Sequence, residues 1–202
     1  MSNEASVPLI PAAALAAPAT RTSLWTRSAG IVLAGSALVA VCAHLAVPLY
    51  FTPVPLSLAP FAVLLLGLLL SPRMAAATLG AYLAEGAMGL PVFAPTPLAP
   101  SGLAHLLGPT GGYLLAYPLA AALIALLFRR GHKGFTRAAL SASAGSLVIL
   151  LCGASWLAVL THVPAQSVFK LAVLPFLPGD ALKVAAAAAV VTGWVRLRRR
   201  IA

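Results

Sequence analysis

The chain has 202 residues, of which 61% are hydrophobic and only 8% are charged. A mean hydropathy of +1.02 excludes an ordinary soluble domain and predicts a helical membrane protein with several spans. The net charge of +10 could suggest binding to nucleic acid, but the basic residues stand beside the ends of apolar runs. That pattern is typical of membrane proteins, so we expect a lipid bilayer around the chain and no nucleic-acid partner.

Residues 1–27 are rich in Ala, Pro, Ser and Thr and lack the basic start and unbroken apolar core of a signal peptide. We expect a flexible cytoplasmic tail here, followed by one transmembrane domain over 28–202. The apolar runs predict an all-α, polytopic fold of six transmembrane helices. We place these spans at 29–47, 58–70, 74–89, 113–128, 138–160 and 178–197.

The second span and two of the connections add detail to this prediction. The second span is short and carries Pro60, so we expect it to enter obliquely or to be extended by the loop before it. The connections 48–57 and 90–112 are rich in proline and have no formal charge, which predicts ordered loops without helix.

The basic residues predict the orientation of the spans. If the six spans alternate in direction, every Lys and Arg except Lys170 and Lys183 falls on one side, which also holds both termini. By the positive-inside rule this side is cytoplasmic. The proline-rich loops then lie outside, and the three ionisable side chains within the spans, Glu85, Asp180 and Lys183, lie towards the outer surface. The sequence thus predicts a polar site that opens outward.

Asp180 and Lys183 stand three residues apart at the start of the last span, so they share one face of a helix. Charge inside a membrane is costly and usually has a function. A carboxylate accepts N–H donors and an ammonium donates to a carbonyl or an anion, so the pair suits a small polar ligand. Alternatively, Asp180 caps the helix and Lys183 only neutralises it or extends to the surface. Glu85 could contact the ligand as well, pair with Lys183 or Lys170, or face a water-filled vestibule.

Motifs of enzymes and metal sites are absent from the sequence. It contains no G-x-x-x-x-G-K-[ST] phosphate-binding loop, no GxSxG and no HExxH, and Cys42 and Cys152 stand apart inside apolar runs. We therefore expect a protein that is not an enzyme, with no metal and no other cofactor. Without such a phosphate-binding loop, the chain cannot be a P-loop ATPase by itself.

Four stretches together carry a family resemblance: Thr52-Pro-Val-Pro-Leu56, Gly89-Leu-Pro-Val-Phe93, Leu107-Gly-Pro-Thr-Gly-Gly-Tyr113 and Pro175-Phe-Leu-Pro-Gly-Asp-Ala-Leu-Lys183. In order and approximate spacing, they resemble the biotin-specific substrate-binding (S) component of energy-coupling-factor (ECF) transporters, the BioY family. The resemblance extends from about residue 30 to residue 200.

The resemblance implies a six-helix S-component bundle in the bacterial inner (cell) membrane, with a biotin site under the outer loops. It also implies partners, namely a transmembrane coupling (T) subunit and two cytoplasmic ATPase subunits. By position, Asp180 and Lys183 match the polar ligand contacts of the family. We expect Glu85 as a further contact, and apolar walls from Tyr82, Phe93, Tyr113 and Trp156.

The chain departs from the family pattern in two places. The first loop ends in Ser57-Leu58-Ala59, where the family commonly has Thr-x-Gln, and the loop after Phe93 lacks the arginine that family members can carry. Two alternatives stay open. The chain could be an S component for another vitamin, or a structural membrane subunit without a ligand in which Asp180 and Lys183 form only an ion pair.

Overall fold

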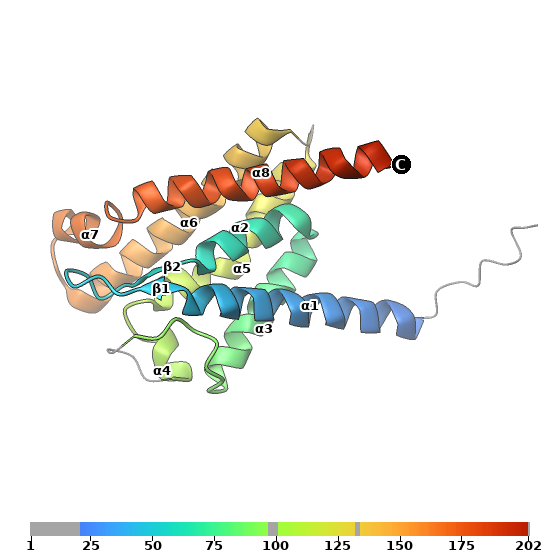
Figure 1. The fold of residues 1–202 in the computed structure, drawn as a ribbon. Helices are drawn as coiled ribbons and strands as arrows, with labels where there is room; N and C mark the ends of the chain where they lie inside the picture. Colours follow the sequence, from blue (N-terminus) through green and yellow to red (C-terminus); the bar gives the residue numbers. More distant parts are fainter. Residues whose placement is uncertain (1–20, 97–100, 132–133, 202) are drawn as a thin grey trace, which may run out of the picture.

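The structure is a computed structural model that describes residues 21–96, 101–131 and 134–201. Over these residues the chain is mainly helical, with two very short strands (Figure 1). The long helices are α1 (Arg21–His44), α2 (Ala59–Leu69), α3 (Pro72–Ala87), α5 (Gly111–Arg129), α6 (Phe135–Thr161) and α8 (Leu177–Ile201). The short elements are β1 (Ala46–Val47), β2 (Leu56–Ser57), α4 (Leu103–Leu106) and α7 (Ala165–Ala172).

Each predicted span corresponds to one of the six long helices, with differences at the boundaries. The largest difference is in α1, which begins at Arg21 rather than at 29 and ends at His44 rather than at 47. Part of the predicted tail is therefore helical, and the rest of it, residues 1–20, lies outside the described residues. The short elements β1, β2, α4 and α7 were not predicted, and α4 contradicts the expectation that 90–112 contains no helix.

The lengths of the helices support membrane crossing only in part. Among the described residues, α1 from Trp25 onwards, α5 and α6 are long and apolar enough to cross a bilayer. A fourth crossing results if α7 and α8, which meet at a bend of 48°, count as one broken span. The 11 residues of α2 reach only about 17 Å, which is shorter than a hydrocarbon core. The chain is thus a multi-pass membrane protein, and the number of six spans stays a prediction.

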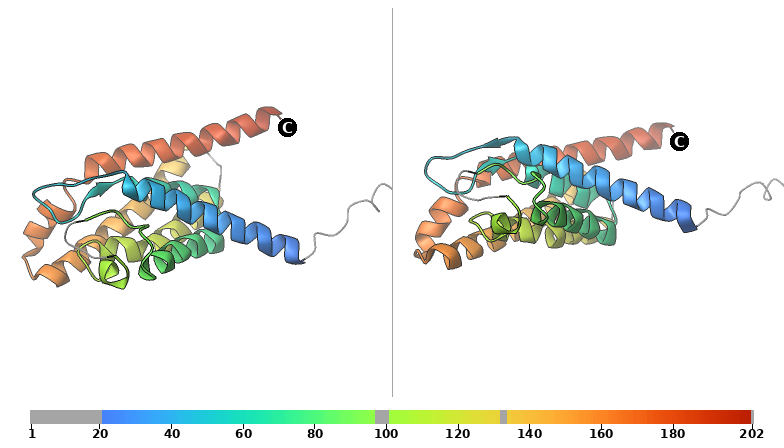
Figure 2. Two further views of the ribbon diagram at one scale, coloured as in Figure 1. Left: turned by 60° about the horizontal axis from the view of Figure 1, so that its bottom comes forward. Right: turned by 90° about the horizontal axis from the view of Figure 1, so that it is seen from below.

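The helices lie side by side, with α5 packed between α2, α3 and α6 (Figures 1 and 2). The end on the left of Figure 1 holds the β1–β2 segment, α4 and α7. The opposite end holds the start of α1, the turn from α2 to α3, the connection from α5 to α6 and the C-terminal part of α8. The two ends therefore differ in structure: one carries the long loops and the other carries short connections and the chain ends.

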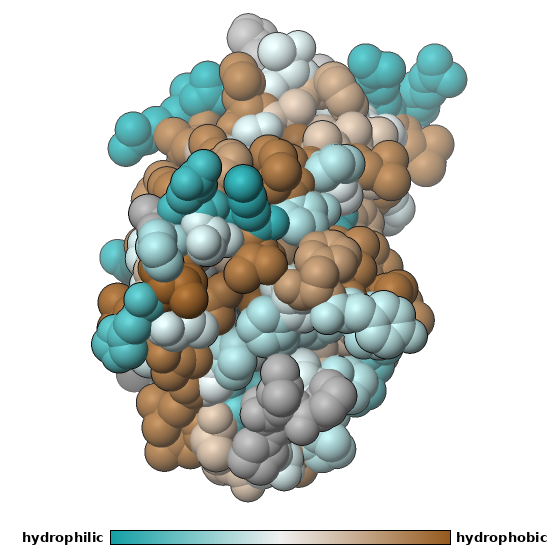
Figure 3. All heavy atoms as spheres, turned by 90° about the vertical axis from the view of Figure 1, so that its left-hand side faces the viewer, coloured by the Kyte–Doolittle hydropathy of each residue, from teal (hydrophilic) through white to brown (hydrophobic). Residues whose placement is uncertain are grey.

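The surface agrees with a lipid environment along the sides of the bundle. Large apolar side chains are exposed on several long helices, among them Leu33, Leu69, Leu119, Leu151 and Leu182. The end that holds β1–β2, α4 and α7 instead shows polar residues interspersed among apolar ones (Figure 3). Such a distribution is expected where an apolar flank faces lipid and an end faces water.

The β1–β2 segment links the end of α1 to the start of α2. The two strands are antiparallel, with Ala46 opposite Ser57, and the N–H of Leu58 donates to the carbonyl of Leu45 at 3.0 Å. These bonds hold the proline-rich connection between the strands in one place, as the sequence predicted for an ordered loop. They also bring Ser57 beside the helices that form the candidate site.

Glycines allow α5 and α6 to approach closely. A Cβ atom at Gly112 of α5 would overlap the Trp156 side chain and come within 2.6 Å of the Cys152 carbonyl oxygen. A Cβ atom at Gly153 of α6 would overlap the ring of Tyr113. Small residues at such contacts are the usual means by which membrane helices pack, because lipid supplies no hydrophobic driving force between helices.

Substitution of Gly112 by Ala is expected to destabilise the bundle, because the added methyl group meets backbone on α6 and forces the two helices apart. A loss of about 1–3 kcal/mol in the free energy of unfolding is typical of such overpacking. The matched control is Gly80→Ala in α3, where nothing lies within 4 Å of the added Cβ. That change should leave stability equal or raise it, because Ala is the better helix former. Thermal unfolding in detergent measures both, and a Gly112→Ala protein as stable as the parent would contradict the packing described here.

Candidate functional site

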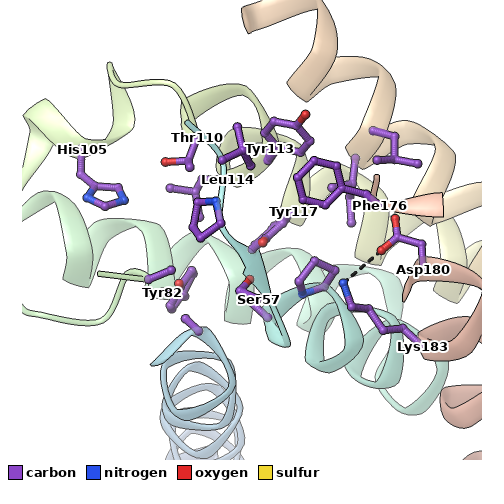
Figure 4. A pocket seen from close by; sticks show the side chains of 18 residues that line it. Ser57, Tyr82, His105, Thr110, Tyr113, Leu114, Tyr117, Phe176, Asp180 and Lys183 are labelled. Atoms are coloured by element: carbon purple, nitrogen blue, oxygen red, sulfur yellow. Dashed lines mark hydrogen bonds and ion pairs between the residues drawn. The ribbon is translucent and has the colours of Figure 1, made fainter. Parts of the chain in front are cut away.

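A narrow cavity of about 50 Å³ lies at the end of the bundle that holds β1–β2 and α4 (Figure 4). Each of the six long helices contributes at least one residue to the wall of this cavity. The first loop, β2 and α4 contribute further residues. The lining residues are Ala43, Val54, Pro55, Ser57, Ala59, Pro60, Tyr82, Ala94, His105, Thr110, Tyr113, Leu114, Tyr117, Ile149, Leu150, Phe176, Asp180 and Lys183.

Asp180 and Lys183 form an ion pair in this wall. The Lys183 Nζ lies 3.1 Å from Asp180 Oδ1. The side chain of Asp180 is only 11% exposed and that of Lys183 only 10%. The second carboxylate oxygen, Oδ2, accepts a hydrogen bond from the Ser146 hydroxyl of α6 at 3.1 Å. The two Asp180 oxygens thus accept hydrogen bonds from Lys183 and Ser146. Neither oxygen accepts a hydrogen bond from a backbone N–H of the described part of α8, so the structure does not support the alternative in which Asp180 caps the helix.

The local sequence explains how the pair reaches the cavity. The segment Pro175–Pro178 ends the connection from α7, and α8 begins at Leu177, which places Asp180 in the first turn. A carboxylate is favourable there because the positive end of the helix dipole lies at the N-terminus. One turn of helix then brings Lys183 onto the same face, as the sequence predicted.

Three tyrosines form the aromatic part of the wall. Tyr82 of α3 stacks against Tyr117 of α5, with ring centroids 6.4 Å apart, and Tyr113 lies 6.3 Å from Phe176. The Tyr82 hydroxyl donates to the Val92 carbonyl at 3.1 Å, and the Tyr113 hydroxyl donates to the Ala172 carbonyl at 2.7 Å. The Tyr82 hydroxyl thus bonds to the segment after α3 and the Tyr113 hydroxyl to the end of α7, which leaves mainly the rings of these two residues to line the cavity.

Four of the residues expected at the site line this cavity: Asp180, Lys183, Tyr82 and Tyr113. The other three, Glu85, Phe93 and Trp156, do not line it. Glu85 lies at the contact between α3 and α1, where its Oε1 is 2.9 Å from the Ser36 hydroxyl. Of the alternatives for Glu85, a pairing with Lys183 or Lys170 is not found among the described residues: Glu85 contacts Ser36, and Lys183 pairs with Asp180.

Phe93 and Trp156 support the wall from behind. The Phe93 ring packs edge-on against Tyr82 at 5.4 Å, and its atoms fill the space beside Gly86. The Trp156 indole N–H donates to the Gly108 carbonyl at 2.9 Å, which holds the segment that leads into α5. Neither ring lines this cavity, but each contacts a residue or segment that does, and their contact with a ligand stays a prediction.

Several residues that line the cavity or contact the ion pair were not identified from the sequence. Tyr117 follows Tyr113 by four residues, so the helical period could have placed both on one face. Ser146 sits in a run of small residues in α6 and gave no signal. His105 lies in α4 and Thr110 just before α5, both within a stretch rich in proline and glycine. The Thr110 hydroxyl is buried without a hydrogen-bond partner among the described residues.

No group of three or more His, Cys, Asp or Glu side chains among the described residues could hold a metal ion. The arrangement instead offers one acceptor and one donor of opposite charge beside aromatic walls. That combination can bind a compact molecule that carries both N–H donors and a carbonyl acceptor.

The comparisons with known proteins agree with this geometry. A model of the BioY family matches residues 13–200. A probable biotin transporter BioY of Pyrococcus horikoshii is 42% identical over 67% of this chain and 76% of its own length. The biotin transporter BioY of Thermotoga maritima is 34% identical over 77% of this chain and 88% of its own length.

A solved structure also has the same fold. The S component for biotin from an ECF-type ABC transporter superposes with a TM-score of 0.78 at 25% identity, over 89% of this chain and 95% of that chain. The match of the family model over nearly the whole sequence, together with these relatives and this structure, leads to one conclusion: the chain belongs to the BioY family.

Proposed function

We propose that this chain is the biotin-binding subunit of a vitamin uptake transporter, which captures biotin at the outer face of the membrane and releases it inward. The observation that carries the proposal is the buried Asp180–Lys183 pair in the wall of an aromatic cavity. The membership of the chain in the BioY family and its likeness to the biotin S component support the choice of biotin as the ligand. The chain is a binding subunit rather than an enzyme.

The chemistry of the pair suits the ureido ring of biotin. That ring has two N–H donors next to one carbonyl, and the pair offers a carboxylate acceptor next to an ammonium donor. The pair is neutral as a whole, and the ureido ring is neutral too, so the ring leaves the charges of the pair balanced. A carboxylate at the same place would lie beside the like charge of Asp180, which is unfavourable. The ureido ring therefore belongs at Asp180–Lys183, with the apolar part of biotin against the tyrosine rings.

The orientation in the membrane follows from the basic residues. In this proposal α1, α2, α3, α5, α6 and α8 are the six spans, and the β1–β2 loop extends α2 towards the outer surface. Arg27, Arg73, Arg130 and Arg137 stand at helix ends on the side opposite β1–β2, as do the arginines at the end of α8. By the positive-inside rule that side and both termini are cytoplasmic, in the bacterial inner membrane, and the cavity opens outward.

Transport needs energy that this chain has no motif to supply. In this proposal a transmembrane coupling subunit and two cytoplasmic ATPases provide it, and tilting of the bundle against the coupling subunit carries the cavity from the outer to the inner side. Two alternatives predict different results. An S component for another vitamin would keep the site and bind a different ring, whereas a structural subunit would keep the ion pair and bind no ligand.

Removal of either charge should weaken biotin binding by at least tenfold, or about 1.4 kcal/mol. The variants are Asp180→Asn and Lys183→Met, measured by equilibrium binding to the purified chain in detergent. Because a lone buried charge can unfold the protein, the double variant Asp180→Asn/Lys183→Met is measured as well. It leaves no unpaired charge, so it should stay folded and still fail to bind.

The control for these variants is Glu85→Gln, which alters another carboxyl group of the bundle that lies away from the cavity. We expect biotin affinity within about threefold of the parent for this change, since a factor of three corresponds to less than 1 kcal/mol. A folded double variant that binds biotin as tightly as the parent would reduce the pair to a structural ion pair.

The orientation can be tested by labelling of single cysteines in intact cells. In a background with Cys42→Ala and Cys152→Ala, Lys170→Cys should react with a membrane-impermeant maleimide from outside, because Lys170 is exposed in α7. Arg130→Cys, exposed at the other end, should react only after the cells are permeabilised. The reverse pattern would contradict the proposed orientation.

A further inference from the structure

The Thr110 hydroxyl lacks a hydrogen-bond partner in a place where water does not reach it. Thr110 is 8% exposed, and its Oγ1 is the one buried side-chain polar atom among the described residues without a partner. A buried hydroxyl left unpaired is costly, and native proteins keep few of them. Thr110 also lines the cavity that holds Asp180 and Lys183.

The usual structural uses of a threonine do not apply at this position. Thr110 precedes α5 at the N-cap position, yet its side chain forms no cap hydrogen bond. The fully buried Thr78 and the buried Thr192 bond instead to carbonyls of their own helices, at 2.8 Å and 2.7 Å. Thr110 thus differs from these threonines because its hydroxyl has no hydrogen-bond partner in the part of the chain that the structure describes.

The backbone beside Thr110 offers further donors. The first N–H groups of a helix have no partner within the helix, and they point towards its N-terminus. In α5 the N–H of Gly111 bonds to Gly108, but no carbonyl among the described residues accepts the N–H of Gly112 or Tyr113. Both residues are buried. The start of α5 therefore combines unpaired N–H donors and the positive end of the helix dipole with the unpaired Thr110 hydroxyl, an arrangement that favours an anion.

The sequence around this point contains no formal charge that could bind an anion instead. From Leu90 to Phe128 there is no Lys, Arg, Asp or Glu. His105, which lies 5.0 Å from the Phe93 ring between centroids, is the one histidine of that stretch. An anion bound here would be held mainly by hydrogen-bond donors and the helix dipole.

We propose that the start of α5 is the subsite for the carboxylate of the ligand, with the Thr110 hydroxyl donating to one carboxylate oxygen. The inference rests on the proposed function. In the view of Figure 4, Thr110 and His105 lie on one side of the cavity and the Asp180–Lys183 pair on the other. With the ureido ring at the pair, the aliphatic tail runs past Leu114 and Tyr117 and ends at Thr110. The two polar groups of the ligand thus meet two separate polar sites.

The test compares biotin with biotin methyl ester, whose tail carries no charge, in the full-length purified chain. The parent should bind biotin more tightly than the ester. Thr110→Val, which has the same shape without the hydroxyl, should weaken biotin binding about tenfold and ester binding by less than about threefold. Thr110→Ser keeps the hydroxyl and should restore most of the affinity for biotin.

The stability of the ligand-free protein separates this role from a structural one. Thr110→Val removes an unpaired buried hydroxyl, so it should melt at the same temperature as the parent or higher. The matched control Thr192→Val removes a hydroxyl that bonds within α8, and it should leave both affinities unchanged.

The possible outcomes distinguish the subsite from the function. Equal affinity of Thr110→Val and the parent for biotin overturns the subsite alone, as does an equal loss for biotin and the ester. A fall in melting temperature together with an equal loss for both ligands would make Thr110 structural. A folded parent that binds no biotin overturns the proposed function, and the subsite with it.

Discussion

Lys183 and Asp180 carry opposite charges 3.1 Å apart inside a bundle whose buried side chains are mostly apolar. Removal of each charge from water costs several kcal/mol, and their attraction offsets this cost only when the geometry is good and the other lone pairs are satisfied. Ser146 contributes the second hydrogen bond to Asp180, so α6 and α8 must keep their register at this level. Apolar residues would stabilise the bundle as well or better. The proposed ligand therefore explains the pair better than stability does.

The cavity wall and the loops around it are joined by the aromatic residues. Close packing of α5 on α6 at Gly112 and Gly153 sets the position of Tyr113 and of the start of α5. The hydroxyl of Tyr113 then bonds to the end of α7, and the hydroxyl of Tyr82 bonds to the segment after α3. A ligand that contacts these rings is thus coupled through two hydrogen bonds to the segments that enclose it. In the proposed function, ligand binding is therefore linked to the conformation of the end that holds β1–β2, α4 and α7.

The sequence predicted the elements that depend on local patterns. Long apolar runs located the six long helices, and the spacing of Asp180 and Lys183 predicted their shared face. Prediction from the sequence failed where the position or partner of a side chain depends on tertiary contacts. The partner of Glu85 is Ser36, far away in the sequence, and Phe93 and Trp156 lie behind the wall because they fill space beside Gly86 and Gly112. Short elements such as α4 and α7 have too few residues for a clear period, and the unpaired state of Thr110 is visible only once its neighbours are placed.

The measurement that tests the account most directly is equilibrium binding of labelled biotin to the purified parent chain, with unlabelled biotin, riboflavin and thiamine as competitors. The account predicts saturable binding at one site per chain, displaced by biotin and unaffected by an equal excess of the other two vitamins. Displacement by riboflavin or thiamine at the same concentration would show that the site accepts another vitamin. Absence of saturable binding to a folded chain would contradict the central claim that the Asp180–Lys183 cavity is a biotin site.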